Sequence, residues 1–192
     1  MRRILSMVAG LTLAGVALST PATAYEIDPF TGQPTTPFFG YAPQASGIAR
    51  EVVAYPARYS AGSIVVSTAE RRLYYILGNG TAIRYGVGVG RPGFAWGGSM
   101  PITRKAEWPG WTPPAQMLRR RPDLPRHMVG GPNNPLGARA MYLGSSLYRI
   151  HGSNEPDSIG QAVSSGCIRM LNDDVVDLYD RVRVGTRVYV QR

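Results

Sequence analysis

Short runs of β-branched and aromatic residues, separated by turn-forming residues, fill the chain from about residue 59 onward. The runs Ser63–Ser67 and Arg72–Leu77 are joined by a short polar segment, which predicts a β-hairpin. Gly78-Asn79-Gly80 predicts a turn into a third strand over 82–89. The same pattern predicts further strands, over 140–143, 147–150 and 186–190.

A helical repeat of apolar residues is clear in one place, near the carboxyl end. Asn172 is the expected N-cap, and the carboxylates of Asp173 and Asp174 suit the positive start of a helix. The apolar face that follows consists of Val175, Val176, Leu178, Tyr179 and Val182. Short helices are also predicted over 113–120 and 159–163. Many strands and few helices predict a mainly β domain.

The stretch from 91 to 137 is rich in Pro, Gly, Trp and Arg and shows little periodicity. A loop of this length in a compact domain is usually functional, so it predicts a lid or a wall of a binding site. Trp96, Trp108 and Trp111 could line a substrate groove there. Equally, they could form a small core for the loop itself.

The first 24 residues have the pattern of a cleaved signal peptide. Arg2 and Arg3 precede an apolar run over 4–18, and Ala22-Thr23-Ala24 offers small residues for cleavage after Ala24. The run is shorter than the ~20 residues that a bilayer span needs, so we expect no transmembrane anchor after processing. We expect residues 25–58 to form a Pro-rich N-terminal extension, a tether or strap, and 59–192 to form the main folded domain.

Charge limits the partners of the processed chain. Without Arg2 and Arg3, 19 basic residues (21 − 2) stand against 12 acidic residues, a formal charge of +7. Such an excess attracts polyanions, but export argues against nucleic acid. An anionic partner outside the cytoplasm fits better, and a basic surface that serves only solubility is the alternative.

The single cysteine stands in a context that favours chemistry. Exported proteins use cysteines in disulfide pairs, so a lone thiol is either reactive or tolerated in a core. Cys167 lies in Ser164-Ser165-Gly166-Cys167-Ile168-Arg169, and His151 precedes it by sixteen positions in Ile150-His151-Gly152. A nucleophilic thiol needs a base or a cationic neighbour. His151 can supply the first and Arg169 the second.

The glycines beside these two residues fit the same chemistry. Gly166 permits a tight turn that aims successive amides at one point, as an oxyanion hole requires. Gly152 lets the chain leave its strand sharply, and a backbone carbonyl there could hold the tautomer of the imidazole. The alternative is a hydrogen-bonded core histidine together with an ordinary turn around a buried thiol. Both parts of that alternative must hold for the chain not to be an enzyme.

The pattern His-Gly, a spacer, then Ser-x-Gly-Cys-x-Arg resembles the signature of the L,D-transpeptidases, the YkuD-type domain. The resemblance covers 63–192, and the segments 108–114 and 130–139 are similar to the periplasmic, ErfK-like branch. It implies a mainly β fold, a YkuD-like β-sandwich or barrel with one or two short helices and a long flap loop over the cysteine. It also implies peptidoglycan stem peptides as substrates, a periplasmic location, and no cofactor or metal.

By this resemblance, Cys167 attacks the third residue of a tetrapeptide stem and expels the terminal D-alanine, with His151 as the base. An amine of a second stem then resolves the thioester and gives a 3→3 cross-link. Backbone groups around Ser165, Gly166 and Cys167 would bind the oxyanion, and Arg169 would steady the loop or a substrate carboxylate. Gly152 and Ser164 would support the loop, and Trp108 and Trp111 are the substrate-flap candidates. Many members have His where this chain has Ser165.

Other outcomes stay open. Water could resolve the thioester, as in an L,D-carboxypeptidase, or an outer-membrane protein or lipoprotein could accept the stem. A non-catalytic wall-binding protein is the alternative of another class. Gly88-x-Gly90-x-x-Gly93 matches a dinucleotide fingerprint only formally, because Pro92 interrupts it and no amphipathic helix follows. His127 has no metal-ligating neighbours in sequence, and we expect it on the surface of the flap.

Overall fold

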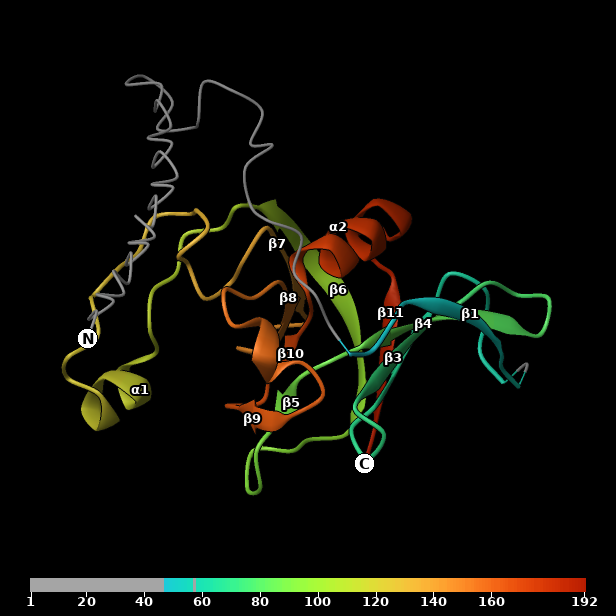
Figure 1. The fold of residues 1–192 in the computed structure, drawn as a ribbon, viewed down its shortest axis with the longest axis horizontal. Coiled ribbons are helices and arrows are strands. Elements are labelled where there is room, and N and C mark those ends of the chain that lie inside the picture. Colours follow the sequence, from blue (N-terminus) through green and yellow to red (C-terminus); the bar gives the residue numbers. More distant parts are fainter. Residues whose placement is uncertain (1–46, 57) are drawn as a thin grey trace, which may run out of the picture. The chain divides into compact units, whose positions relative to one another are not determined.

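The computed structural model describes residues 47–56 and 58–192. The predicted signal peptide and the extension up to residue 46 lie outside the described residues. The described chain forms eleven strands and two α-helices (Figure 1). The strands are β1 (Glu51–Ala54), β2 (Ile64–Ser67), β3 (Arg72–Ile76), β4 (Thr81–Gly86), β5 (Val89–Gly90), β6 (Gly98–Glu107), β7 (Arg139–Leu143), β8 (Arg149–His151), β9 (Ala162–Ser164), β10 (Ile168–Arg169) and β11 (Arg187–Gln191). The helices are α1 (Ala115–Arg120) and α2 (Asn172–Arg181), with one 3-10 turn at Pro156–Ser158.

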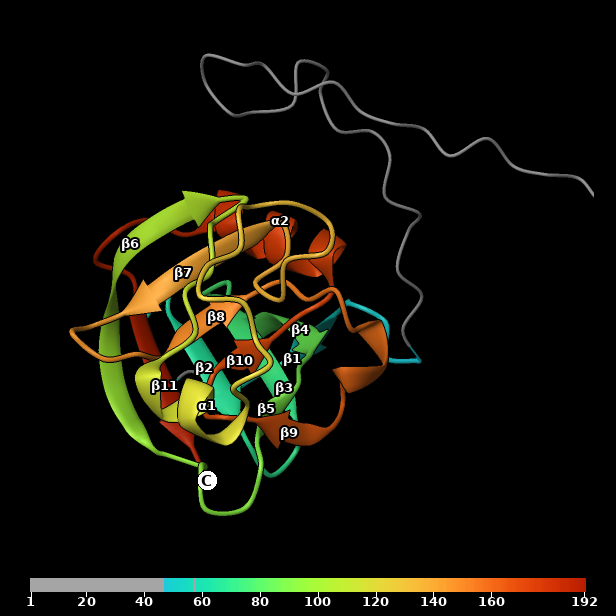
Figure 2. The ribbon, with the colours of Figure 1, turned by 90° about the vertical axis from the view of Figure 1, so that its left-hand side faces the viewer.

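Nine of the strands form one sheet in the order β1-β4-β3-β2-β11-β6-β7-β8-β10, and β5 pairs separately with β9. Strand β6 bends the sheet back on itself. Its first residues, Gly98 to Pro101, pair with β11, whereas 102–107 pair with β7, and the register shifts between Ile102 and Arg104. Such an irregularity bends a strand. Figure 2 shows β6 curving from one half of the sheet to the other.

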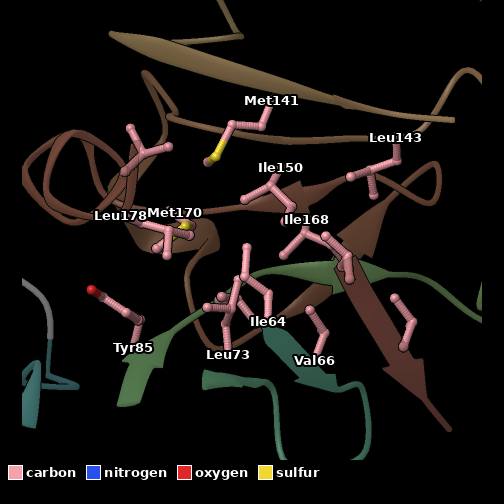
Figure 3. Close-up of a cluster of buried hydrophobic side chains, with 14 of the residues drawn as sticks. Ile64, Val66, Leu73, Tyr85, Met141, Leu143, Ile150, Ile168, Met170 and Leu178 are labelled. Atoms are coloured by element: carbon pink, nitrogen blue, oxygen red, sulfur yellow. The ribbon is translucent and has the colours of Figure 1, made fainter. Parts of the chain in front are cut away.

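The core fills the space between the two halves of the sheet. Ile64, Leu73 and Tyr85 come from β2, β3 and β4, and they meet Met141 and Ile150 from β7 and β8 (Figure 3). Helix α2 closes one side and adds Val175 and Leu178 to this cluster. Each of these side chains is at most 1% exposed, so the core is dry. This arrangement confirms the predicted sandwich-like, mainly β fold.

The outer face of β2, β3 and β4 carries a second, smaller cluster. Val65, Ile76 and Ala82 are buried there, under tyrosines that include Tyr55 and Tyr74. The rings of Tyr55 and Tyr74 lie 4.7 Å apart between centroids. Strand β2 is therefore buried on both faces, which explains its continuous apolar run.

Several sequence-based expectations hold, among them the hairpin of β2 and β3, the short helix α1 and the helix α2. Four details differ. The loop predicted over 91–137 contains the ten-residue strand β6, in which Ile102 is the one fully buried residue. No helix forms over 159–163, where the chain enters β9. Strand β1 lies within the predicted extension and pairs with β4.

The fourth difference concerns the start of α2. The N-cap is Leu171, and the side-chain oxygen of Asn172 accepts a hydrogen bond from the Ala138 amide at 2.9 Å. The Asn172 side-chain oxygen, which we predicted to cap the helix, is thus used in a tertiary hydrogen bond to the Ala138 amide. Among the described residues, no helix is long and apolar enough to cross a bilayer.

Candidate active site

The two short strands β8 and β10 bring the signature residues together. They run parallel, with Ile150 opposite Ile168 and His151 opposite Arg169. Successive residues of a strand point to opposite faces. Ile150 and Ile168 therefore enter the core, and their neighbours on both sides turn towards a pocket that Arg149, His151, Cys167 and Arg169 help to line.

His151 is held as a neutral base. Its ring is 4% exposed, and Nδ1 lies 2.5 Å from the carbonyl oxygen of Gly152. A carbonyl can only accept, so Nδ1 carries the proton and Nε2 keeps its lone pair. Burial, together with the charges of Arg169 and Arg149, lowers the pKa of His151 to about 3, although the hydrogen bond to the Gly152 carbonyl opposes the change. The imidazole is therefore neutral at physiological pH.

Cys167 is a free, half-buried thiol. Its Sγ lies 3.8 Å from the carbonyl oxygen of Leu147, the nearest hydrogen-bond acceptor that the structure gives it. Burial raises the pKa of the Cys167 thiol, and the positive charges and hydrogen bonds of Arg149, with the charge of Arg169, work in the opposite direction. At neutral pH the pocket thus holds an uncharged Cys167 thiol and a neutral His151 imidazole.

Ser164 organises the turn that carries the cysteine. Its hydroxyl donates to the carbonyl of Cys167 at 2.6 Å and accepts from the amide of Gly166 at 3.1 Å. The Gly166 amide is therefore engaged within the loop. The Ser165 hydroxyl also lies 3.3 Å from Nη1 of Arg91, on the pocket side.

Gly166 is required at its position by both conformation and space. Its φ is +108°, a region that favours glycine, and an added Cβ would come 2.5 Å from Cε1 of Tyr148. The ring of Tyr148 is in turn stacked on that of Trp96: the ring centres lie 4.6 Å apart, with 3° between the planes. The Trp96 indole also donates to the Gly166 carbonyl at 2.8 Å. The loop thus rests on an aromatic pair.

Arg169 and Gly152 have structural contacts that explain their residue types. Arg169 forms an ion pair with the exposed carboxylate of Glu155 at 2.5 Å. A Cβ at Gly152 would collide with the side-chain oxygen of Asn172, and it would lie 3.0 Å from the Ala138 amide nitrogen and 3.2 Å from Cα of Gly137. Glycine is therefore required at 152 by the close approach of the Asn172 side chain and of the neighbouring backbone.

The pocket beside Cys167 has a volume of about 450 Å³ and is covered by the segment 108–137, which we call the flap. The flap carries α1 and is pinned by mutual backbone hydrogen bonds between Trp111 and Met128, both 2.8 Å long. In Figure 2 it crosses in front of β7 and β8. It contributes the pocket-lining residues Trp111, Pro114, Gln116, Met117, Arg120, Pro135 and Leu136.

The three tryptophans therefore have different places. Trp111 lines the pocket. Trp108 lies at the base of the flap, where its amide donates to the Ala138 carbonyl, and it is not among the pocket-lining residues of the described chain. Trp96 is 8% exposed and supports the cysteine loop through its hydrogen bond to the Gly166 carbonyl. The exposed ring of His127 hydrogen-bonds Thr112 at 3.0 Å on the flap surface. Within the described residues, no group of three or more His, Cys, Asp or Glu side chains could hold a metal ion.

Sequence reasoning missed Arg149, Leu147 and the Trp96–Tyr148 pair. Arg149 had a signal, because a residue two positions before His151 on a strand faces the same side. The carbonyl of Leu147 and the stacked rings had none, since only the fold brings them to the cysteine. The formal dinucleotide fingerprint is a strand end: Gly88 forms a β-bridge with Arg169, and Gly90 lies in β5.

Fold and pocket together define a single β domain that places one thiol and one imidazole beneath a covering loop. A family model described as the L,D-transpeptidase catalytic domain, YkuD, matches residues 61–190. The chain belongs to this family of L,D-transpeptidase catalytic domains.

Individual relatives agree with the family. Over 134 residues, the chain is 42% identical to a probable L,D-transpeptidase of Escherichia coli (strain K12), ErfK/SrfK, covering 66% of this chain and 43% of that protein. The chain thus spans less than half the length of this relative. A protein of Fuscovulum blasticum, provisionally named an L,D-transpeptidase in the ATP synthase subunits region, is 32% identical over 198 residues, covering 99% of this chain and 97% of that one.

Among solved structures, an L,D-transpeptidase from Mycobacterium smegmatis superposes with a TM-score of 0.56. The alignment covers 69% of this chain and 59% of that chain at 18% identity, so it supports the fold alone.

Proposed function

We propose that the protein is a peptidoglycan L,D-transpeptidase that forms a thioester between Cys167 and the third residue of a tetrapeptide stem. The observation that carries the proposal is the hydrogen bond from Nδ1 of His151 to the Gly152 carbonyl. It leaves Nε2 as a proton acceptor in the pocket that also holds the thiol. A buried base with a fixed tautomer beside a nucleophile is the arrangement that acyl transfer needs.

Acylation begins when the Cys167 thiol passes its proton to Nε2 of His151. The sulfur attacks the carbonyl carbon of the third residue, and the amides of Ser165 and Cys167 are the candidate donors to the resulting oxyanion. The carbon–nitrogen bond to the terminal D-alanine then breaks, and His151 returns the proton to the leaving amine. This leaves the thioester and a neutral imidazole.

Deacylation reverses these roles. The amine of a second stem attacks the thioester, His151 removes its proton, and the proton returns to the sulfur as the carbon–sulfur bond breaks. The product carries a 3→3 cross-link. A neutral imidazole suits this step, because it must accept a proton from the incoming amine.

Charge and location fit the same proposal. We infer export by the segment 1–24 and action in the periplasm, where stem peptides carry carboxylates. Arg91, Arg120, Arg149 and Arg169 lie at or beside the pocket, and Glu155 pairs with one of them. The pocket is thus basic, which suits an anionic donor.

The test is incubation of the mature protein with purified disaccharide-tetrapeptide, followed by mass spectrometry. We expect cross-linked dimers and released D-alanine from the wild type, neither from C167A, and a rate about 10²–10⁴-fold lower from H151Q. A carbapenem should add to the wild type and not to C167A. Absence of both the thioester and the carbapenem adduct from a folded protein would refute the proposal.

The same experiment separates the alternatives. Tripeptide monomers without dimers would indicate an L,D-carboxypeptidase, and transfer to the lysine of an outer-membrane protein or lipoprotein would indicate an anchoring enzyme. Binding to the sacculus without turnover would indicate a wall-binding protein. We favour the cross-linking outcome because the family whose model matches residues 61–190 is that of the L,D-transpeptidase catalytic domain.

A further inference from the structure

Arg149 occupies the position on β8 that is level with the cysteine. The parallel register places Ile168 opposite Ile150, so Cys167, one residue earlier, comes level with Arg149. Both residues are one step from a core-facing isoleucine, and both line the pocket. The guanidinium and the sulfur therefore share one side of this strand pair.

The two side chains also share a hydrogen-bond acceptor. Nη1 of Arg149 donates to the carbonyl of Leu147 at 3.2 Å, and Sγ of Cys167 lies 3.8 Å from the same oxygen. Nε of Arg149 is buried and has no hydrogen-bond partner among the described residues. The guanidinium carbon lies 5.2 Å from the ring centre of Tyr142, which limits how far the side chain can swing. The guanidinium of Arg149 is therefore held in the pocket that also contains the Cys167 sulfur, and its Nε–H can still donate a hydrogen bond.

The other charged groups around the sulfur are occupied elsewhere. Arg169, on β10, pairs with Glu155. Arg91 contacts the Ser165 hydroxyl and lies 4.1 Å from the Phe94 ring centre, and Arg120, on α1, lies 5.7 Å from the same centre.

His151 offers no positive charge at rest, because burial holds its pKa far below neutral. Burial raises the pKa of Cys167, and the charge of Arg149 is the largest opposing influence. Arg149 is therefore the cation best placed to favour the anionic sulfur.

We propose that Arg149 is a positioning residue for the nucleophile: its guanidinium holds the anionic sulfur of Cys167 once His151 has taken the proton. The inference rests on the nucleophile assigned under the proposed function, and it deepens that assignment. An arginine cannot lose its charge in the working pH range, so the stabilisation is present at every pH at which the enzyme acts.

The experiment measures alkylation of Cys167 by iodoacetamide against pH, a reaction that needs no peptide substrate. The thiolate attacks the methylene carbon, a carbon–sulfur bond forms, and iodide leaves. We expect the midpoint of the R149Q profile to lie about one pH unit above that of the wild type. Alkylation at pH 7 should then be about tenfold slower, with equal rates at high pH. R149M, whose apolar stem keeps the packing on Tyr142, should show the same shift, whereas R149K should stay near the wild type.

R104Q is the matched control. The guanidinium carbon of Arg104 lies 3.5 Å from the ring centre of the same Tyr142, and Arg104 is exposed. Like R149Q, the R104Q substitution removes one positive charge and a contact with the Tyr142 ring. The pH profile of alkylation in R104Q should nevertheless superpose on that of the wild type. Thermal melting of each variant confirms that the fold is retained.

Each outcome decides. A raised midpoint in both neutral variants supports the role of Arg149, even if no stem peptide is ever transferred, in which case only the proposed function fails. Superposed profiles overturn the inference. A rate that falls by one factor at every pH, or a shift as large in R104Q, also overturns it, since access or general charge would then explain the effect.

Discussion

The contact between Trp96 and the cysteine loop offers a quantitative test of how the site is supported. The change W96F removes the indole N–H that donates to the buried carbonyl of Gly166 at 2.8 Å. It keeps an aromatic ring against Tyr148, with which Trp96 stacks. The perturbation is therefore close to the loss of one buried hydrogen bond.

The free energy follows from that contact. A buried acceptor left without a partner costs about 1–3 kcal/mol. Phenylalanine is smaller than tryptophan, so W96F leaves a cavity where the indole, only 8% exposed, was packed. This cavity adds roughly 1 kcal/mol to the loss of stability. We expect the free energy of unfolding to fall by about 2–4 kcal/mol and the melting temperature by roughly 6–14 °C for a domain of this size.

The assay is thermal and urea unfolding of the mature protein, with Cys167 alkylation as a second readout. W111F is the control, because the half-buried Trp111 indole donates no hydrogen bond to any residue of the described chain. W111F should lose less than about 1 kcal/mol. If W96F is as stable as W111F, or if W96F unfolds early while alkylation of the folded protein is unchanged, the reasoning about loop support is wrong.

Three further predictions concern other parts of the domain. G166A combines a φ of +108° with a Cβ only 2.5 Å from Tyr148, so it should cost about 2–4 kcal/mol in urea unfolding and slow alkylation of Cys167. K105M removes two 2.7 Å hydrogen bonds from Lys105 to the last carbonyls of α2, at Tyr179 and Val182, and should cost about 1–2 kcal/mol in the same assay. Burial raises the pKa of Asp174 to about 6, with Arg50 opposing and the neighbouring Asp177 and Asp173 adding to the rise. The folded state therefore binds this proton more tightly than the unfolded chain, and stability falls as the pH rises from about 4 to about 6. After allowance for solvent screening and the favourable helix start, the loss is about 1 kcal/mol, and D174N should gain that much on the wild type between pH 4 and pH 7 in melting curves.

Local pattern was enough for most of the fold. The runs at β2, β3 and β7 are apolar because these strands are buried. A strand buried on both faces gives a continuous apolar run and a strand buried on one face gives an alternating pattern, so the sequence shows both directly. The apolar repeat of α2 was equally readable. Strand β6 was missed because nine of its ten residues are exposed or only partly buried, and because it changes partner midway, from β11 to β7. A residue pattern cannot report a change of partner.

The candidate site divides in the same way. The residues Cys167, His151, Gly166 and Arg169 and their spacing were visible in the chain, and the carbonyl that holds the imidazole was expected beside Gly152. The hydrogen bond between the Gly166 amide and the Ser164 hydroxyl could not be predicted from the sequence, because it depends on the rotamer of one side chain. Neither could the pairing of Arg169 with Glu155, which joins residues fourteen apart through a turn.

The amino-acid sequence by itself determined the chemistry available to this protein: one thiol, one nearby imidazole, and glycines where the backbone must turn or approach closely. It also determined the mainly β character, because strand and helix periods are local properties. Only the tertiary structure decided which cation stands beside the sulfur and which is paired with a carboxylate. It also decided which tryptophan faces the pocket and which carries the loop. Charge and burial act through space, so their effects on a group are fixed by neighbours that the chain brings together only on folding.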